Sequence, residues 1–425
     1  MADARPGTSR LSAALLVLLL ALQPWQEAQA YLQPKERQAL DLSYEVNDPD
    51  ESFFDVAARM RLLADTEDPM LRQLANKLQM GLSCRSLQAQ PVLDGEVTLP
   101  SFYDNPDEWG LTVEPLLAFE QTMSDLAGAW VASGDRYYAD CLLGILDRWA
   151  AENALYEFDF DRSRPQAWYG IESMIFAAAL AFSTVTGEIE IAPERRKTIN
   201  DWLVRTAKKH FNTPASNPSC CNNHYYRRAL YMTIVGVVAD NDELFETGLR
   251  SVYSALDDLN RDGALQLAMR RGWRAIHYQN YSLLYLVTTM QVAYRQGYDL
   301  FTLEKDGVGF DEAVAFLLRS LNNPYAIPAL PPGDQDLSFT NDAQYFSWME
   351  IWLAHFEDPA MAEFMRIYRP IFNRGAGGYL TLYFKRPEGP RGVVARDIGD
   401  IEALQLTSAV SGGRYPLLEK WRRSQ

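Results

Sequence analysis

The sequence predicts an all-α protein built from a long series of antiparallel helix hairpins, arranged as a solenoid or a closed helical toroid. From about residue 36 to residue 370, apolar residues recur at spacings of three and four, the period of a helix that buries one face. Gly134, Gly187 and Gly297 follow apolar stretches, where helices commonly end. Because the connections are short, successive helices must run antiparallel to bury their apolar faces together.

The first thirty residues are expected to be removed rather than folded. Two arginines precede the apolar stretch 11–22, and a polar segment ends in Ala28-Gln29-Ala30. This order is typical of a secretory signal peptide, and the stretch is shorter than the roughly 20 residues that span a bilayer. We therefore expect a periplasmic or secreted mature chain, 31–425, without membrane contact, because no later stretch looks apolar enough to cross one.

Nine stretches with helical spacing follow. The clearest is 242–259, where the apolar residues from Leu244 to Leu256 form one stripe behind Asp240 and Asn241 as candidate caps. This uninterrupted series predicts a single domain over 31–425. The other stretches lie at about 114–133, 137–152, 168–186, 193–211, 225–239, 278–296, 310–321 and 342–356.

Two irregular segments interrupt the helices, and long segments of this kind are often functional. Residues 91–113 are rich in Pro, Gly, Asp and aromatic residues, and residues 322–341 contain four prolines and the run Gly333-Asp334-Gln335-Asp336. Near the C-terminus, residues 379–384 alternate as in a β-strand, which predicts one minor strand.

Composition and absent motifs narrow the function. The 425 residues are 48% hydrophobic, enough for a full core, and the net charge is 40 − 56 = −16. An acidic chain is a poor match for nucleic acid, and an anionic ligand would need a local cationic patch. The sequence has no Walker A loop, dinucleotide glycine motif, Gly-x-Ser-x-Gly or His-Glu-x-x-His. This argues against nucleotide and zinc-protease chemistry.

Four cysteines, Cys84, Cys141, Cys220 and Cys221, suggest two disulfides in an exported chain. Neighbouring Cα atoms lie about 3.8 Å apart, whereas ordinary disulfides need roughly 4.4–6.8 Å. The adjacent pair must therefore either bond to the two distant cysteines or form an unusual bridge. A zinc site is disfavoured because Cys-x-x-Cys is absent and the chain has four histidines, so no metal is expected.

His, Tyr, Asn and Arg gather in two runs, residues 220–228 and 270–281, each where a loop enters a helix. Helix N-termini carry free N–H groups and a positive dipole end, so both places suit an anion. The runs also hold five arginines, which predict a local cationic site in an acidic protein: Arg227, Arg228, Arg270, Arg271 and Arg274.

These residue types fit β-elimination on a sugar carboxylate. Arginine and amide donors can neutralise the carboxylate, which makes the neighbouring carbon acidic enough to lose its proton. A tyrosine or histidine can take that proton, and a phenol can protonate the leaving oxygen. We therefore expect cleavage of a polyuronate with neither metal nor other cofactor.

Two motifs carry a family resemblance. Asn-Asn-His-Tyr-Tyr at 222–226 and Arg-x-x-Arg-Ala-x-x-Tyr-x-Asn-Tyr at 271–281 resemble the mannuronate-specific alginate lyases of polysaccharide lyase family five, and the run at 333–336 is similar too. A looser similarity extends over about 80–360. The resemblance implies an exported bacterial enzyme with an incomplete α/α toroid, a long lid loop and mannuronate-rich alginate as the substrate.

The resemblance also implies roles for individual residues. Asn223 and Arg271 would neutralise the uronate carboxylate. Tyr278 would protonate the glycosidic oxygen, and in a syn elimination it would act as base as well. His224 would be a neutralising partner, or the base of an anti elimination. The disulfides implied by the resemblance are Cys84–Cys141 and Cys220–Cys221.

One position departs from the family. Where its members often read Ser-Lys-Tyr in the lid, this chain has Phe102 before Tyr103. Tyr103 can still close over a sugar, but the lid cation is missing. Glucuronan and other polyuronates therefore stay open as substrates.

Four further residues could either bind the substrate or have a structural role. Trp168 and Tyr169 would stack on sugar rings or pack in the core, and Arg274 would bind polymer or pair with an acid. His277 adjoins Tyr278 but points about 100° away on a helix, which favours a structural role.

Two other function classes compete with a lyase. A glycoside hydrolase would need two carboxylates flanking the bond, for which Asp159, Asp161 and Glu172 are candidates. A non-catalytic protein would only bind polysaccharide in the cationic groove. In each case the expected partner is an anionic polysaccharide, with no nucleic acid, and a monomer is favoured.

Overall fold

The computed structural model describes residues 31–79, 82–102, 104–163, 165–214, 219–391 and 415–423. The signal peptide predicted at 1–30 and the lid residue Tyr103 lie outside the described residues. The signal peptide and the domain boundary at residue 30 therefore stay predictions.

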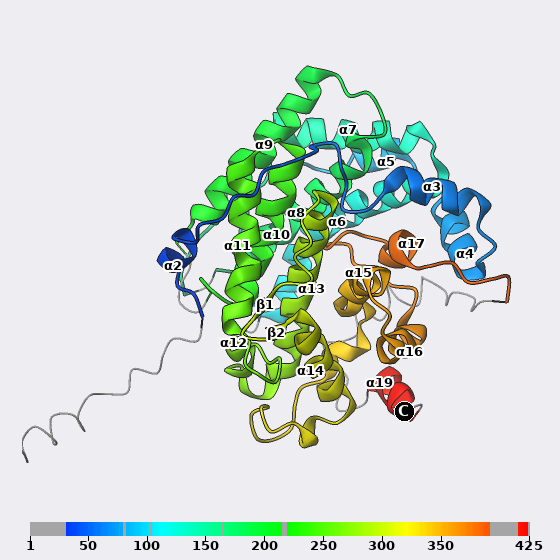
Figure 1. Ribbon diagram of the computed structural model, residues 1–425. Coiled ribbons are helices and arrows are strands. Elements are labelled where there is room, and N and C mark those ends of the chain that lie inside the picture. The colour runs from blue at the N-terminus through cyan, green and yellow to red at the C-terminus, as the bar shows by residue number, and fades with distance from the viewer. Residues whose placement is uncertain are drawn as a thin grey trace, which may run out of the picture.

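Two rows of helices form the body of the molecule (Figure 1). In the inner row each helix contacts the next, and the outer helices pack against it. This is the toroid of helix hairpins that the sequence predicts. The inner row comprises α6 (Pro106–Ser133), α8 (Gln166–Thr186), α10 (Asn223–Val238), α13 (Ala275–Arg295) and α15 (Ser347–His355), and the outer row α7 (Arg136–Ala151), α9 (Pro193–Asn212), α11 (Asp242–Asp258) and α14 (Phe310–Asn322).

Shorter elements complete the fold. Before the toroid come α2 (Pro34–Gln38), α3 (Val56–Asp65), α4 (Pro69–Leu78) and α5 (Cys84–Gln88). Within and after it lie α12 (Gln266–Met269), η1 (Gly272–Arg274), β1 (Glu304–Lys305), β2 (Val308–Gly309), η2 (Pro324–Ala326), η3 (Ser338–Asn341), η4 (Ala343–Phe346), α16 (Pro359–Tyr368), α17 (Leu380–Phe384) and α19 (Pro416–Arg422).

The helix ends follow the punctuation in the sequence. Asn241 caps α11 by accepting a hydrogen bond from the Leu244 amide, and Asp135 caps α7 in the same way through the Tyr137 amide. Gly134 closes α6 with a φ of 66°, a conformation that glycine adopts without a steric penalty.

The first inner helix begins earlier than the sequence pattern indicated. α6 starts at Pro106, whereas the apolar spacing predicted a start near 114. Proline is suited to the first helical position, and Asp107 and Glu108 in the first turn favour the helix dipole. Pro115 lies inside this helix and concealed its first turns. The irregular segment therefore ends at residue 105.

The predicted C-terminal strand is wrong. Residues 380–384 form α17, in which the Tyr383 amide donates to the Tyr379 carbonyl. All five residues of α17 are buried, so the alternation in the sequence marked no solvent-exposed face. The described residues contain one hairpin instead, β1–β2, which turns at Asp306-Gly307 with positive φ at both positions.

Helix α8 corrects another expectation. By length and composition α8 could cross a membrane, although no stretch after residue 30 was expected to be apolar enough. However, 83% of its most apolar window is buried inside the protein. A helix that is apolar all round is also what the core of a large helical fold requires, and here α8 packs between α6 and α10.

The inner row positions the candidate site. Every residue of α10 is buried except His224, in its first turn. Tyr169, in the first turn of α8, stacks on the His224 ring, so the N-terminal ends of these two helices lie together. The site therefore forms where inner helices begin.

Candidate active site

A braced turn leads into α10. Cys220 and Cys221 are bonded to each other, and Cys84 is bonded to Cys141, which are the pairings that the resemblance implies. The Arg37 guanidinium donates a hydrogen bond of 2.7 Å to the Cys220 carbonyl oxygen. These contacts fix the backbone immediately before Asn222.

Asn222 and Asn223 have different tasks. The Asn222 side chain caps α10 by accepting a hydrogen bond of 3.1 Å from the His224 amide. Asn223 is 3% exposed, and its Nδ2 has no hydrogen-bond partner among the described residues. A buried amide donor without a partner is costly, so Asn223 is a candidate for binding a ligand.

His224 is held between a ring and a carboxylate. Its imidazole stacks on Tyr169 with ring centroids 3.9 Å apart and an angle of 19°. Its Nδ1 lies 3.9 Å from Glu172 Oε2, which is longer than a hydrogen bond. Burial lowers the pKa of His224, while the Glu172 carboxylate acts in the opposite direction. The imidazole is therefore neutral at neutral pH and can accept a proton.

Glu172 lies beside His224, Arg227 and Arg228, which together form the first cluster of the site. Glu172 was not among the predicted site residues of a lyase. It is 0% exposed, and its oxygens lie 3.2 Å from Arg227 Nε and 3.1 Å from Arg228 Nη1. Burial alone would raise the pKa of Glu172, but Arg227, His224 and Arg228 together lower it to about 2. One feature of the sequence could have identified Glu172: it is a single carboxylate in an apolar helix, and such a carboxylate needs buried partners.

The second cluster lies at the start of α13. The Arg271 Cζ is 3.6 Å from the centroid of the Tyr278 ring, and Tyr278 is largely buried. Gly272, with a φ of 61°, begins the short turn η1 that separates Arg271 from α13. The guanidinium can neutralise negative charge on the tyrosine oxygen or on a ligand carboxylate.

Residues 333–336 hold the second cluster in place through hydrogen bonds and an ion pair. Gln335 donates to the Gly272 carbonyl and accepts from the Ile276 amide, and the Asp336 amide donates to the Trp273 carbonyl. Arg274 Nε lies 3.5 Å from Asp336 Oδ2. Of the two readings for Arg274, the structure thus shows the ion pair with an acid.

The two clusters are neighbours across α10 and α13, which pack together. Arg227 Cζ lies 5.6 Å from the Tyr285 ring, and Tyr281 contacts Tyr285 edge-on at 5.0 Å. His224 lies one turn before Arg227, and Tyr278 one turn before Tyr281. The residues predicted from the two separate runs therefore face the same end of the toroid.

Two predicted sugar contacts differ in their surroundings. Trp168 is 1% exposed, donates from Nε1 to the His210 carbonyl and packs under Arg228. This core position does not fit a stacking role on a sugar ring. Tyr169 is half-buried, and its hydroxyl shares a hydrogen bond of 2.8 Å with Ser219.

The remaining positions lie around these clusters. Phe102 is 42% exposed and contacts Trp109 edge-on, while its lid neighbour Tyr103 lies outside the described residues. His277 packs against Phe339 and Tyr345, and burial lowers its pKa to about 4, in keeping with a structural role.

The carboxylates do not form a hydrolase site around Glu172. A general acid needs a raised pKa, whereas Glu172 is held ionised by two arginines. Asp159 is exposed, and Asp161 accepts hydrogen bonds from Ser163. Among the described residues, no group of three or more His, Cys, Asp or Glu side chains is placed to hold a metal ion.

An arginine, a tyrosine and a histidine gathered at one end of a helical toroid fit a lyase that acts on a polysaccharide. Comparisons with known proteins identify the family. The chain belongs to the alginate lyase family, whose sequence model matches residues 88–327. A polysaccharide lyase of Stenotrophomonas maltophilia is 26% identical over 268 residues, 63% of this chain and 78% of its own. An alginate lyase of Azotobacter vinelandii is 26% identical over 290 residues, 66% and 76% of the two chains.

Solved structures agree in fold. Alginate lyase A1-III from Sphingomonas species A1 superposes with a TM-score of 0.74 and 31% identity, covering 84% of this chain and 100% of that one. A tyrosine-to-phenylalanine variant of A1-III, complexed with a tetrasaccharide, gives a TM-score of 0.73 and 32% identity, with the same coverage. The all-α toroid is thereby confirmed, and the protein is a polysaccharide lyase.

Proposed function

We propose that this lyase is exported and cleaves mannuronate-rich alginate by β-elimination, with side chains rather than a metal ion neutralising the uronate carboxylate. The observation that carries the proposal is the Arg271 guanidinium 3.6 Å from the Tyr278 ring, beside the helix that presents Asn223 and His224. Export is supported by the order of residues 1–30 and by two disulfides in the chain.

The proposed reaction balances without a co-reactant. Arg271 and the Asn223 amide bind the carboxylate, which stabilises the negative charge that develops when the adjacent C5 loses its proton. His224 or Tyr278 takes that proton, the C4–O bond breaks, and a C4–C5 double bond forms. Tyr278 gives its proton to the leaving oxygen.

The relatives support the kind of ligand. Two variants of alginate lyase A1-III, one tyrosine-to-phenylalanine and one histidine-to-alanine, were solved with a tetrasaccharide. The corresponding side-chain types, Tyr278 and His224, lie at the site of this chain. The tetrasaccharide complexes of these alginate lyases support a polyuronate as the substrate of this chain.

A panel of polyuronates tests the proposal. The mature chain should release unsaturated uronate from polymannuronate, seen as a rise in ultraviolet absorbance, because elimination creates a double bond conjugated to the carboxylate. Polyguluronate and glucuronan are the comparison arms, since Phe102 replaces the lid cation of the family. Cleavage without an absorbance rise would indicate hydrolysis and sink the proposal, and preferential cleavage of glucuronan would move the substrate assignment.

The pH dependence tests His224 as the base. Burial lowers the pKa of His224 from its usual 6.5, so the neutral imidazole persists into mildly acidic solution. We expect kcat/KM to stay high down through pH 6.5 and to fall only below it, as the imidazole gains a proton. The measurement is kcat/KM against pH for the wild type and for His224→Asn. If the fall in kcat/KM at acidic pH persists unchanged in His224→Asn, the group that gains the proton is not His224.

A further inference from the structure

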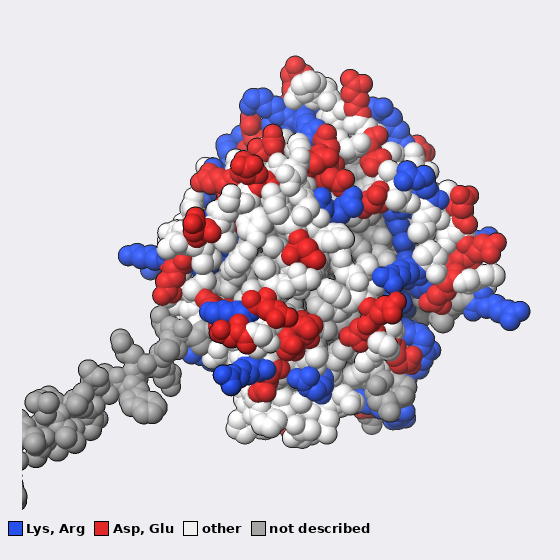
Figure 2. Space-filling view, viewed as in Figure 1, with Lys and Arg blue, Asp and Glu red and all other residues white. Residues whose placement is uncertain are grey.

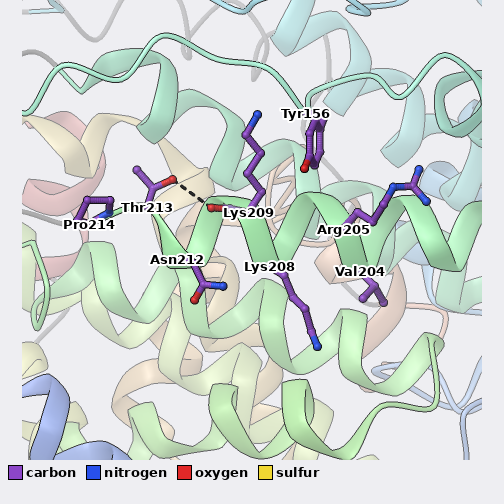
Figure 3. A pocket seen from close by; sticks show the side chains of 8 residues that line it. All are labelled: Tyr156, Val204, Arg205, Lys208, Lys209, Asn212, Thr213 and Pro214. Carbon is purple, nitrogen blue, oxygen red and sulfur yellow. Dashed lines mark hydrogen bonds between the residues drawn. The ribbon is translucent and has the colours of Figure 1, made fainter.

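A second cationic feature lies on the outer wall of the toroid. It is a shallow, open hollow along the C-terminal half of α9, here called the α9 pocket (Figure 3). Tyr156 comes from the segment between α7 and α8 and lies between Lys209 and Arg205 in this view. The lining residues are Tyr156, Val204, Arg205, Lys208, Lys209, Asn212, Thr213 and Pro214.

The lining is cationic within an acidic protein. It contains three cations and no acidic residue, although the chain has a net charge of −16. On the face shown in Figure 2, acidic and basic side chains are instead interspersed. Two acids flank the pocket: Glu243 lies 2.9 Å from Lys208 Nζ, and Glu157 lies 2.7 Å from Lys209 Nζ. Both are mostly exposed, and such surface pairs are weak enough for an anionic ligand to displace.

The chemistry of the pocket suits a sugar acid. Lys209 Nζ lies over the Tyr156 ring, 4.0 Å from its centroid, so the pocket pairs an ammonium group with an aromatic ring. A pyranose can pack against the exposed part of this half-buried ring while its carboxylate meets the ammonium group. Asn212 adds an amide that can bind hydroxyl groups.

A short series of contacts connects the pocket to the catalytic end. His210, next to Lys209, lies on the buried side of α9, and its Nε2 is 2.7 Å from the Trp168 carbonyl oxygen. Tyr169 follows Trp168 in the chain and stacks on His224. The α9 pocket therefore lies on the solvent side of the helix whose buried face contacts the start of α8, where Tyr169 stacks on His224.

We propose that the α9 pocket is a remote binding site for uronate residues of the polymer whose other part occupies the active site. This rests on the proposed function, since it takes the same polysaccharide as ligand. A second attachment point raises the effective concentration of the polymer at the catalytic cleft, but it gives nothing to a fragment too short to reach both places. The signature is a dependence on chain length.

The test compares two double variants of the full mature chain. Lys208→Ala/Lys209→Ala removes two pocket cations, and Arg195→Ala/Lys197→Ala removes two cations from the first half of the same helix. For the pocket variant, kcat/KM on polymannuronate should fall about three- to tenfold relative to kcat/KM on a tetrasaccharide, as expected for a few solvent-exposed ion contacts. The difference should shrink as salt is added, and the control variant should show neither effect.

Failure of the pocket and failure of the proposed function give different results. Equal losses on polymer and tetrasaccharide, or equal losses in both double variants, overturn the remote site while leaving the lyase activity in place. If the wild type cleaves none of the polyuronates, the proposed function fails, and the pocket is then judged by affinity electrophoresis of the variants in gels containing intact polymannuronate. Unchanged mobility of the pocket variant relative to the control there overturns it as well.

Discussion

Tyr278→Phe should lower kcat on polymannuronate by about 10²–10⁴-fold, the usual contribution of a positioned proton donor. The change removes only the phenolic oxygen, so the ring that Arg271 covers stays in place. KM should change little, because carboxylate binding is assigned to Arg271 and Asn223. Steady-state rates of unsaturated product, measured beside binding of a tetrasaccharide by calorimetry, separate the two effects.

The same helix supplies the control. Tyr294 lies in the last turn of α13 and is 44% exposed, so Tyr294→Phe makes the same chemical change away from the site. It should keep the wild-type rate. If Tyr278→Phe keeps full activity while His224→Asn loses it, the proton donor is another group and the role implied by the resemblance is mistaken. Loss of both activity and binding would instead indicate a ligand-binding role.

The fold was largely readable from the sequence because most helices are amphipathic or clearly capped. The stripe behind Asn241 predicted α11 within one residue. Prediction was wrong where local signals conflicted with packing. Pro115 masked the first turns of α6, and the fully buried α17 has an alternating pattern that only its tertiary position explains.

The residues of the candidate site also differ in how far the sequence could predict them. Asn223, His224, Arg271 and Tyr278 lie in two continuous motifs, so the residue types marked the two runs and the family resemblance singled out these four residues. Trp168 was ambiguous since an aromatic residue at a helix start suits either core or sugar, and burial decides for the core. The role of Glu172 could not be read from spacing, because its partners on α10 are 52 to 56 residues away and meet it only when α8 and α10 pack.

Glu172→Gln should cost the fold about 3–5 kcal/mol, the usual effect of leaving buried charges without their partner. Arg227 and Arg228 are both buried, and Glu172 is the carboxylate that both contact. Gln keeps the shape but not the charge. Glu363→Gln, which breaks an exposed pair with Arg366, is the matched control and should change the free energy of unfolding little. Urea unfolding followed by circular dichroism measures both variants.

The pH dependence of that stability identifies its origin. The pKa of Glu172 is lowered to about 2 in the folded protein, against 4.5 for an ordinary glutamate. Its stabilisation is therefore complete above pH 4.5 and is lost as the pH falls from 4.5 to about 2, a loss of about 3 kcal/mol in the wild type. Glu172→Gln has no such proton to bind, so the gap between the two proteins should close over this range. A gap that stays constant down to pH 2 would mean that Glu172 stabilises by packing rather than by its charge.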